Sequence, residues 1–132
     1  MARSINYTGL KVGGFVPFAS ALVKGTDENK LVKISASGTV VLVTTEDTNF
    51  FGVVRVIDGD DKAASVQVDG VVTIAYDTDH APTVTTGSGW QGLQVGKTPF
   101  ATNVKAVTEA AGIPMYRILA VDTVAHTVTF LL

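Results

Sequence analysis

Cysteine is absent from this chain, and charged residues are scarce, at 17% of the sequence. The lack of cysteine excludes disulfides and thiolate metal sites. No basic patch stands out and the net charge is −2, so nucleic-acid binding has no electrostatic footprint. No apolar run approaches the roughly 18 residues that span a bilayer, and no apolar signal region follows Met1 to Ser4. We therefore expect no nucleic-acid partner, no membrane partner and no secretion by signal peptide.

The chain is nevertheless apolar: its mean hydropathy is +0.34 and 46% of its residues are hydrophobic. An apolar, weakly charged chain without a membrane span suggests surface that is buried between subunits. The alternative is a monomer that is simply rich in Val and Ala. At 132 residues the length predicts one domain with a substantial core.

Residues 31–57 contain three β-rich runs. Residues 31–35 and 39–44 flank a turn with Gly38, which predicts a hairpin. The runs at residues 40–43 and 50–54 are apolar without alternation, as in strands covered on both faces. In a small domain one face meets the core, and the other needs a flap, a second sheet or another subunit. The candidate residues for an oligomer interface are Val41, Val43, Phe50 and Phe51.

The N-terminal segment 1–18 has weak structure signals. Spaced apolar residues stand among polar residues, and Gly13-Gly14 is a flexible joint. We interpret residues 1–18 as an extended arm plus an edge segment, and residues 19–132 as a β-barrel-like or sandwich-like domain. An ordinary first strand over residues 5–12 is the alternative.

Several later segments have two interpretations each. Asp69-Gly70 fits a two-residue hairpin turn or a bulge inside one strand. Residues 77–89 form a long polar loop of the kind that is usually functional or disordered. Trp90, which closes this loop, fits either a plug at a barrel end or a contact anchor. Residues 103–111 have helical propensity, with Gly112 as a stop.

A weak internal repeat favours strand rather than helix at residues 103–108. Segments 39–44 and 50–58 align with segments 103–108 and 114–122, both at an offset of 64 (108 − 44 and 122 − 58). Segments 31–34 and 66–68 align with segments 93–96 and 128–130, both at an offset of 62 (96 − 34 and 130 − 68). Self-similarity of this kind indicates a duplicated strand unit. Together with the turn signals, these patterns predict an all-β protein of seven to nine short strands.

No catalytic or cofactor-binding constellation is recognisable. Residues 95–98 resemble the end of a phosphate-binding loop, but the first glycine of that motif is displaced by one residue. Asp77, Asp79 and His80 offer metal-ligand types, although acidic loops are usually turns. His126 fits a barrel end or an interface better than a general base. We expect no enzyme activity, no metal and no cofactor.

Taken in order, the β-strand phrases resemble the capsid decoration, or cement, proteins of tailed bacteriophages. The matching phrases are LVKIS from residue 31, SGTV from 37, FGVV from 51, VDGVV from 68, ILAVD from 118 and TVTFLL from 127. The resemblance covers most of residues 9–132. Residues 77–89 and 97–101 depart from any pattern in it.

This resemblance implies a structural virion protein on the exterior of the head, which passes through the host cytoplasm during assembly. It implies a homotrimer that binds the major capsid protein and stabilises contacts between capsomers. The capsid contact would be the N-terminal arm, with candidate residues Ile5, Tyr7, Leu10, Val12 and Phe15. A carbohydrate- or ligand-binding β-module is the alternative function, with Trp90, Tyr76 and the loop of residues 77–89 as its platform.

Overall fold

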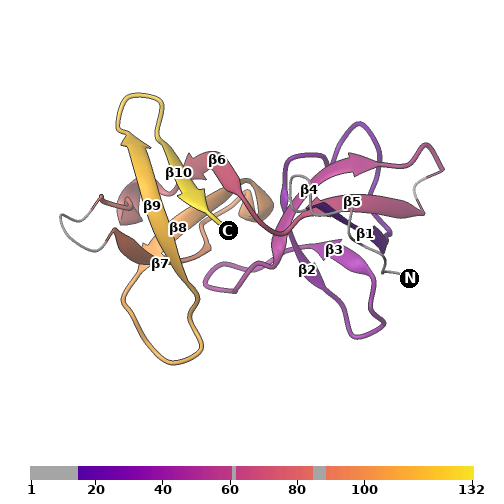
Figure 1. The fold of residues 1–132 in the computed structure, drawn as a ribbon, viewed down its shortest axis with the longest axis horizontal. Helices are drawn as coiled ribbons and strands as arrows, with labels where there is room; N and C mark the ends of the chain where they lie inside the picture. Colours follow the sequence, from indigo (N-terminus) through magenta and orange to yellow (C-terminus); the bar gives the residue numbers. More distant parts are fainter. Residues whose placement is uncertain (1–14, 61, 85–88) are drawn as a thin grey trace. The chain divides into compact units, whose positions relative to one another are not determined.

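The computed structural model of the protein describes residues 15–60, 62–84 and 89–132 (Figure 1). These residues form ten β-strands and two short 3-10 turns, without an α-helix. The predicted all-β fold is confirmed, but the predicted number of seven to nine strands is too low. No helix in this part of the chain is long and apolar enough to cross a membrane. The chain divides into two compact units: unit 1 comprises Met1–Leu42 and Phe51–Gly70, and unit 2 comprises Val43–Phe50 and Val71–Leu132.

Unit 1 is a five-stranded antiparallel sheet in the order β1-β5-β4-β2-β3. Its strands are β1 (Phe15–Ala19), β2 (Leu31–Ile34), β3 (Val40–Leu42), β4 (Gly52–Ile57) and β5 (Ala63–Gln67). The predicted hairpin is β2–β3, and Gly38 supplies the positive φ of 85° that its turn requires. A parallel bridge between Ser20 and Val40 joins the two outer edges of the sheet. The core of unit 1 is Leu22, Val32, Val40, Val54, Ile57, Ala64 and Val66.

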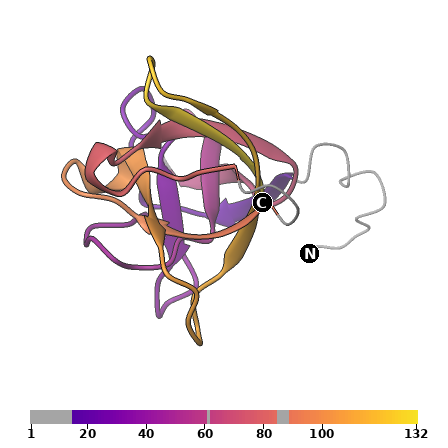
Figure 2. The same cartoon turned by 90° about the vertical axis from the view of Figure 1, so that its left-hand side faces the viewer.

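Unit 2 is a closed five-stranded barrel in the order β10-β6-β8-β7-β9 (Figure 2). Its elements are β6 (Val71–Tyr76), the 3-10 turn η2 (Thr78–His80), β7 (Trp90–Val95), the 3-10 turn η3 (Phe100–Thr102), β8 (Asn103–Val107), β9 (Met115–Asp122) and β10 (Thr127–Leu131). The barrel closes through a parallel pairing of β6 with β8, at Ala75 with Asn103 and Tyr76 with Val104. Burial alternates strictly along β6, as expected for a strand with one wet face.

The helix considered for residues 103–111 is wrong. Residues 103–107 are β8, which pairs with β7 on one side and with β6 on the other. Helix propensities differ by only about 0.7 kcal/mol between ordinary residues, so strand pairing on both edges outweighs them. The strand that the internal repeat predicted here is confirmed.

Both interpretations of Asp69-Gly70 are also wrong. The strand before it, β5, and the strand after it, β6, belong to different sheets, so the dipeptide is neither a hairpin turn nor a bulge. Gly70 has a φ of 90°, which lets the chain turn out of the first sheet. Asp69 assists because its side chain accepts a hydrogen bond from the Gly70 backbone N–H, at 2.7 Å.

The two units have the same strand topology. Replacing β1, β2, β3, β4 and β5 by β6, β7, β8, β9 and β10 converts each strand pairing of unit 1 into one of unit 2. The parallel bridge of Ser20 with Val40 corresponds to the parallel pairing of Tyr76 with Val104. The internal repeat expected from the sequence therefore describes two copies of one five-stranded unit.

The repeat extends to the pairing register. In β4 the register skips Arg55, and in β9 it skips Leu119, its equivalent at an offset of 64 (119 − 55). A β-bulge thus recurs at the same place in both copies. Val66 pairs with Val54 as Phe130 pairs with Ile118. Strands β5 and β10 therefore align at an offset of 64 (130 − 66) rather than the expected 62.

The alignment of β2 with β7 also needs a correction. Lys33 pairs with Val41, and Gln94 pairs with Lys105, which is the equivalent of Val41 at the offset of 64 (105 − 41). In its pairing with the third strand of the unit, Gln94 therefore corresponds to Lys33 at an offset of 61 (94 − 33), not 62. A shift of one residue exchanges the two faces of a strand, and only pairing can resolve it.

Candidate interaction surface

A line of directly opposed residues crosses four neighbouring strands of unit 2. Val71 in β6 is opposite Leu131 in β10, which is opposite Arg117 in β9, which is opposite Trp90 in β7. All four are exposed, and the apolar members Val71, Leu131 and Trp90 expose 53%, 39% and 49% of their surface. We call these four residues the Trp90 row. It is an apolar band on the outside of the barrel, interrupted by one cation.

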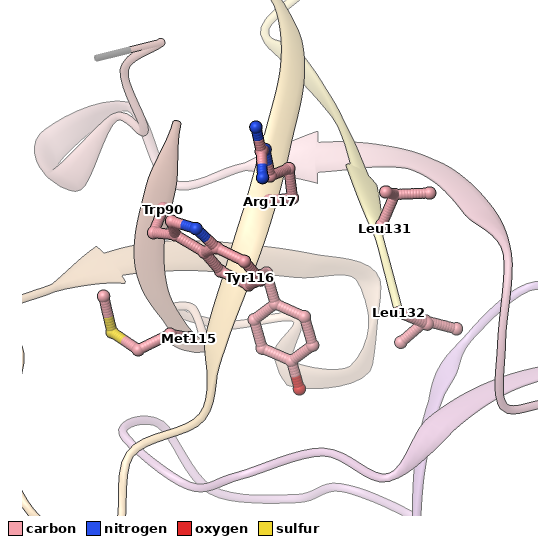
Figure 3. Close-up of a pocket in the computed structure, with 6 residues that line it drawn as sticks. All are labelled: Trp90, Met115, Tyr116, Arg117, Leu131 and Leu132. Atoms are coloured by element: carbon pink, nitrogen blue, oxygen red, sulfur yellow. The ribbon is translucent and has the colours of Figure 1, made fainter. Parts of the chain in front are cut away.

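A hollow of about 350 Å³ adjoins the Trp90 row (Figure 3). Its lining residues are Trp90, Met115, Tyr116, Arg117, Leu131 and Leu132. In Figure 3, Met115 lies on one side of β9 and the two leucines lie on the other. Burial raises the pKa of the Tyr116 phenol to about 12, so this group is neutral at physiological pH. The hollow therefore offers apolar walls and one positive charge.

Arg117 lies over the face of Trp90, with its guanidinium carbon 5.5 Å from the ring centroid. This is a cation–π contact, because the negative face of the indole attracts the cation. No carboxylate among the described residues forms an ion pair with Arg117.

Trp90 is a surface residue and not the plug of a barrel end. It begins β7, and Gly89 just before it accepts a hydrogen bond from the Ile118 backbone N–H at 2.7 Å. The bond fixes the strand edge so that Leu93 and Val95 face inward and Trp90 faces outward. Of the two interpretations of Trp90, the contact anchor is the one compatible with this position.

In the corresponding line of unit 1, Leu31, Val53 and Gln67 are buried. This line passes through Val53, the equivalent of Arg117, and follows the same pairings to Phe15, Gln67 and Leu31. The exposed fractions of Leu31, Val53 and Gln67 are 0%, 1% and 6%. They alternate with the core residues of their strands, so they occupy the outward face. The same face is thus covered in one copy of the fold and open in the other.

The predicted oligomer-interface residues divide into two kinds. Val43 and Phe50 are buried, at 2% and 5% exposure, and the Phe50 ring packs on Tyr116 in unit 2. They offer no surface to another subunit, because the apolar run at this position supplies the core of the chain itself. Val41 is half-buried and Phe51 is 37% exposed, so an interface role for these two stays a prediction.

The predicted arm contacts fall almost entirely outside the described residues. Ile5, Tyr7, Leu10 and Val12 lie there, and their proposed capsid contact stays a prediction. Phe15 begins β1, where its backbone pairs with that of Gln67. The edge segment expected at the end of residues 1–18 is thus the strand β1, which begins at Phe15.

A polar cluster holds one end of the unit 2 barrel together. The buried Asp77 carboxylate accepts a hydrogen bond from the Asp79 N–H at 2.9 Å and lies 3.4 Å from Lys97 Nζ and 3.5 Å from His80 Nδ1. Burial acts to raise the pKa of Asp77, but the Asp79 N–H, His80 and Lys97 outweigh it and lower the pKa. Asn103 donates to the Lys97 backbone carbonyl and so fixes the adjoining loop. Within the described ranges, no three His, Asp or Glu side chains gather as metal ligands.

A second buried charge ties residues 46–47 to the barrel. Lys105 Nζ lies 2.8 Å from both Glu46 Oε2 and Asp47 Oδ1, and its side chain is only 7% exposed. Hydrogen bonds from the ammonium to Asp47 and Glu46 raise the pKa of Lys105. Both carboxylates are better solvated than the ammonium, so this is a structural clamp.

The sequence analysis identified Trp90 but missed its neighbours Arg117, Leu131 and Val71. A signal was present in β10, whose outward positions are Thr127, Thr129 and then Leu131, so the leucine breaks a threonine face. Only the register, however, shows that this leucine and Trp90 lie on one line.

Searches against protein-family descriptions, curated proteins and solved structures find no match to this chain.

Proposed function

We propose that the protein is a structural component of a tailed-bacteriophage virion, without enzymatic activity. It binds the outer surface of the assembled head and stabilises contacts between capsomers of the major capsid protein. Homotrimers decorate the capsid exterior, and the N-terminal arm makes the shell contact. The β-strand segments resemble those of capsid decoration proteins in the same order, and this resemblance is the reason for naming the major capsid protein as the partner.

The Trp90 row is the structural observation that supports a role in binding other proteins. Exposed apolar bands rimmed by polar residues are typical of protein interaction sites. Aromatic residues and arginine are enriched at the centres of such sites. A protein that acts by holding others together needs surfaces of this kind on a rigid scaffold, and closed barrels provide one.

The deciding experiment uses phage heads that were assembled without this protein. We expect the purified protein to cosediment with these heads, to saturate at a fixed stoichiometry and to raise the temperature at which the heads release DNA. Unassembled major capsid protein serves as the control for recognition of the assembled shell. Heads that bind none of the protein, at concentrations well above those of the capsid subunits, would contradict the proposal.

The hollow beside Trp90 favours one alternative, a carbohydrate- or ligand-binding module. An exposed indole next to a cation is a suitable platform for a sugar ring or an anionic ligand. Trp90 is the only tryptophan, so its fluorescence reports binding at this place directly. Saturable quenching by a glycan from an array, together with no binding to heads, would favour the module over the virion protein.

A further inference from the structure

We propose that Asp69 and Gly70 form a site of covalent self-modification. The Gly70 backbone nitrogen attacks the Asp69 side chain, and the resulting succinimide opens in water to isoaspartate. The inference goes beyond the proposed function and does not depend on it, because the reaction takes place within one chain. Three observations carry it: a contact between the reacting groups, a hydrogen-bond relay that activates the nitrogen, and a second Asp-Gly pair without either feature.

The two reacting groups are already in contact. The Gly70 N–H donates a hydrogen bond to Asp69 Oδ1, at 2.7 Å between nitrogen and oxygen. The carbon to be attacked carries this oxygen, so it lies close to the nitrogen as well. Groups that are held together in this way have little freedom left to lose when they react. Glycine also has no side chain to obstruct the attack.

A relay of hydrogen bonds acts on the peptide group that contains the Gly70 nitrogen. Gln67 Nε2 donates to the backbone carbonyl of Asp69 at 2.9 Å, and that carbonyl shares its peptide group with the Gly70 N–H. Arg55 Nε donates in turn to Gln67 Oε1, also at 2.9 Å. Hydrogen bonds in series polarise one another, and a charged donor strengthens them. Polarisation of the carbonyl draws electrons from the nitrogen, so its proton leaves more readily, as the attack requires.

The relay is held by the sheet of unit 1 and not by the turn. Gln67 is 6% exposed, and its backbone pairs with Phe15 on one side and with Val53 on the other. Arg55 is the residue that the register of β4 skips, and its second nitrogen, Nη1, donates to Asn29 Oδ1 at 2.9 Å. A β-bulge commonly redirects a side chain, and here the residue at the bulge is the charged donor of the relay.

The reaction needs no partner other than water. With the side chain in its carboxyl form, the Gly70 nitrogen bonds to the side-chain carbon, and the bond from that carbon to its hydroxyl oxygen breaks. The hydroxyl leaves with the Gly70 proton as one water molecule. Asp69 is exposed, so water can then add to the ring. Addition at the main-chain carbonyl breaks its bond to the nitrogen and leaves isoaspartate, with the mass of the original chain.

Isoaspartate changes the main chain at the point where it passes from one sheet to the other. Only Val68, Asp69 and Gly70 separate β5 from β6. Isoaspartate directs the main chain through the former side chain, which adds one methylene group to this short connection. The modified chain should therefore unfold at a lower urea concentration than the original one.

The chain contains its own reference, Asp58-Gly59. Both residues are exposed, in the turn after β4. Among the described residues, no hydrogen bond joins the Asp58 side chain to the Gly59 N–H, and no side-chain donor binds the Asp58 carbonyl. The two pairs have the same chemistry, so a difference between their rates in the folded protein comes from the structure.

The test follows isoaspartate at both sites during prolonged incubation of the full-length protein, folded in buffer and unfolded in urea. Trypsin cleaves after Arg55 and Lys62, so Asp58 and Asp69 fall in separate peptides. Electron-transfer fragmentation then distinguishes isoaspartate from aspartate. We expect similar rates at the two sites in urea and, in the folded protein, a rate at Asp69 about tenfold above that at Asp58. A ratio that is the same in both states, or lower in the folded one, would overturn the inference.

Two variants test the relay. Gln67→Glu keeps an acceptor for Arg55 but has no N–H for the Asp69 carbonyl, and Arg55→Met removes the charged donor. We expect each to lower the rate at Asp69 in the folded protein, by up to about tenfold. The rates at Asp58 and in urea should not change, which separates the relay from a general effect on folding. An unchanged rate at Asp69 in both variants would show that Asp69-Gly70 is an ordinary turn.

Discussion

The ring of Phe50 stacks on the ring of Tyr116, with centroids 5.2 Å apart and ring planes within 8° of parallel. Phe130 packs edge-on against both of these rings, at 6.1 Å from Phe50 and 5.2 Å from Tyr116. Residues 43–50 thereby contribute an aromatic side chain to the core of unit 2, although all the strands of that unit follow much later in the sequence.

Phe50→Ala is therefore expected to destabilise the protein strongly, by about 3–5 kcal/mol. Phe51→Ala is its neighbour and control, because Phe51 is 37% exposed and makes one edge contact with Phe18. It is expected to cost about 1 kcal/mol. Urea unfolding curves measure both. Equal effects of the two substitutions would contradict the assignment of Phe50 to the core.

The pH dependence of the unfolding free energy of Tyr116→Phe tests whether the phenol is buried. The pKa of Tyr116 is raised to about 12 in the folded chain, against about 10 when unfolded. The folded state thus favours the protonated phenol, and its stabilising contribution is present below pH 10 and lost as the pH rises through 12. The difference between the two pKa values corresponds to about 3 kcal/mol.

We therefore expect unfolding free energies of wild type and Tyr116→Phe to run parallel up to pH 10 and then to diverge, with the variant losing less. Lys105 also titrates in the alkaline range but is present in both proteins, so their difference isolates Tyr116. Parallel curves up to pH 12 would show that the phenol is solvated.

Gly96→Ala tests the close approach of the chain after β7 to Asn103. A Cβ at Gly96 would collide with the Asn103 side-chain oxygen, which is buried and accepts no hydrogen bond. The substitution is expected to cost about 1–3 kcal/mol. In an Asn103→Ala background the collision disappears, so Gly96→Ala should cost much less there. Thermal unfolding of the four proteins of this double-mutant cycle measures the coupling, and purely additive effects would refute the collision.

Substitutions on the two sides of the Lys105 ion pairs should lower the stability of the protein by different amounts. The double substitution Glu46→Gln and Asp47→Asn leaves the ammonium buried without a counter-charge, so it should cost about 1–3 kcal/mol. Lys105→Met removes the buried charge and leaves two carboxylates that water can reach, so it should cost less. Chemical unfolding at pH 7 compares them. A larger loss for Lys105→Met would show that the ion pairs themselves are strongly stabilising.

Deletion of residues 2–12 tests the proposed shell contact of the arm. Fixing about ten residues costs roughly 10–20 kcal/mol, which several arms acting together can offset through effective concentration. We expect the truncated protein to keep the fold and the oligomeric state of the full chain but to lose head binding. The described strands begin at Phe15, so the deletion leaves them intact. Unchanged decoration of heads would transfer the contact to another surface, with the loop before Trp90 as the next candidate.

Much of the fold could be predicted because its signals are local. The turn at Gly38 requires a positive φ, and the short apolar runs have the length of strands, so β2, β3 and β4 follow from their own residues. The offset of 64 between β3 and β8 (105 − 41) and between β4 and β9 (118 − 54) could be found because duplication leaves similar residues at similar places. The last strand, β10, followed from its alternation.

Whether an apolar side chain packs in the core or meets solvent depended on the tertiary structure. The apolar residues Phe50 and Phe51 are identical in type, yet one packs in a core and the other meets solvent. An apolar residue needs cover, and its identity does not say whether the same chain or another supplies it. This is why Val43 and Phe50 were misassigned to an interface.

By itself, the sequence determined an all-β chain built from a repeated strand unit, because hydrophobic period and turn chemistry act over a few residues. The tertiary structure decided that residues 103–107 are a strand and that β5 and β6 lie in different sheets. It also decided that Trp90, Arg117, Leu131 and Val71 form one line across four strands. The physical reason is that strand pairing joins residues far apart in the sequence, and its free energy exceeds the small local preferences that a sequence displays.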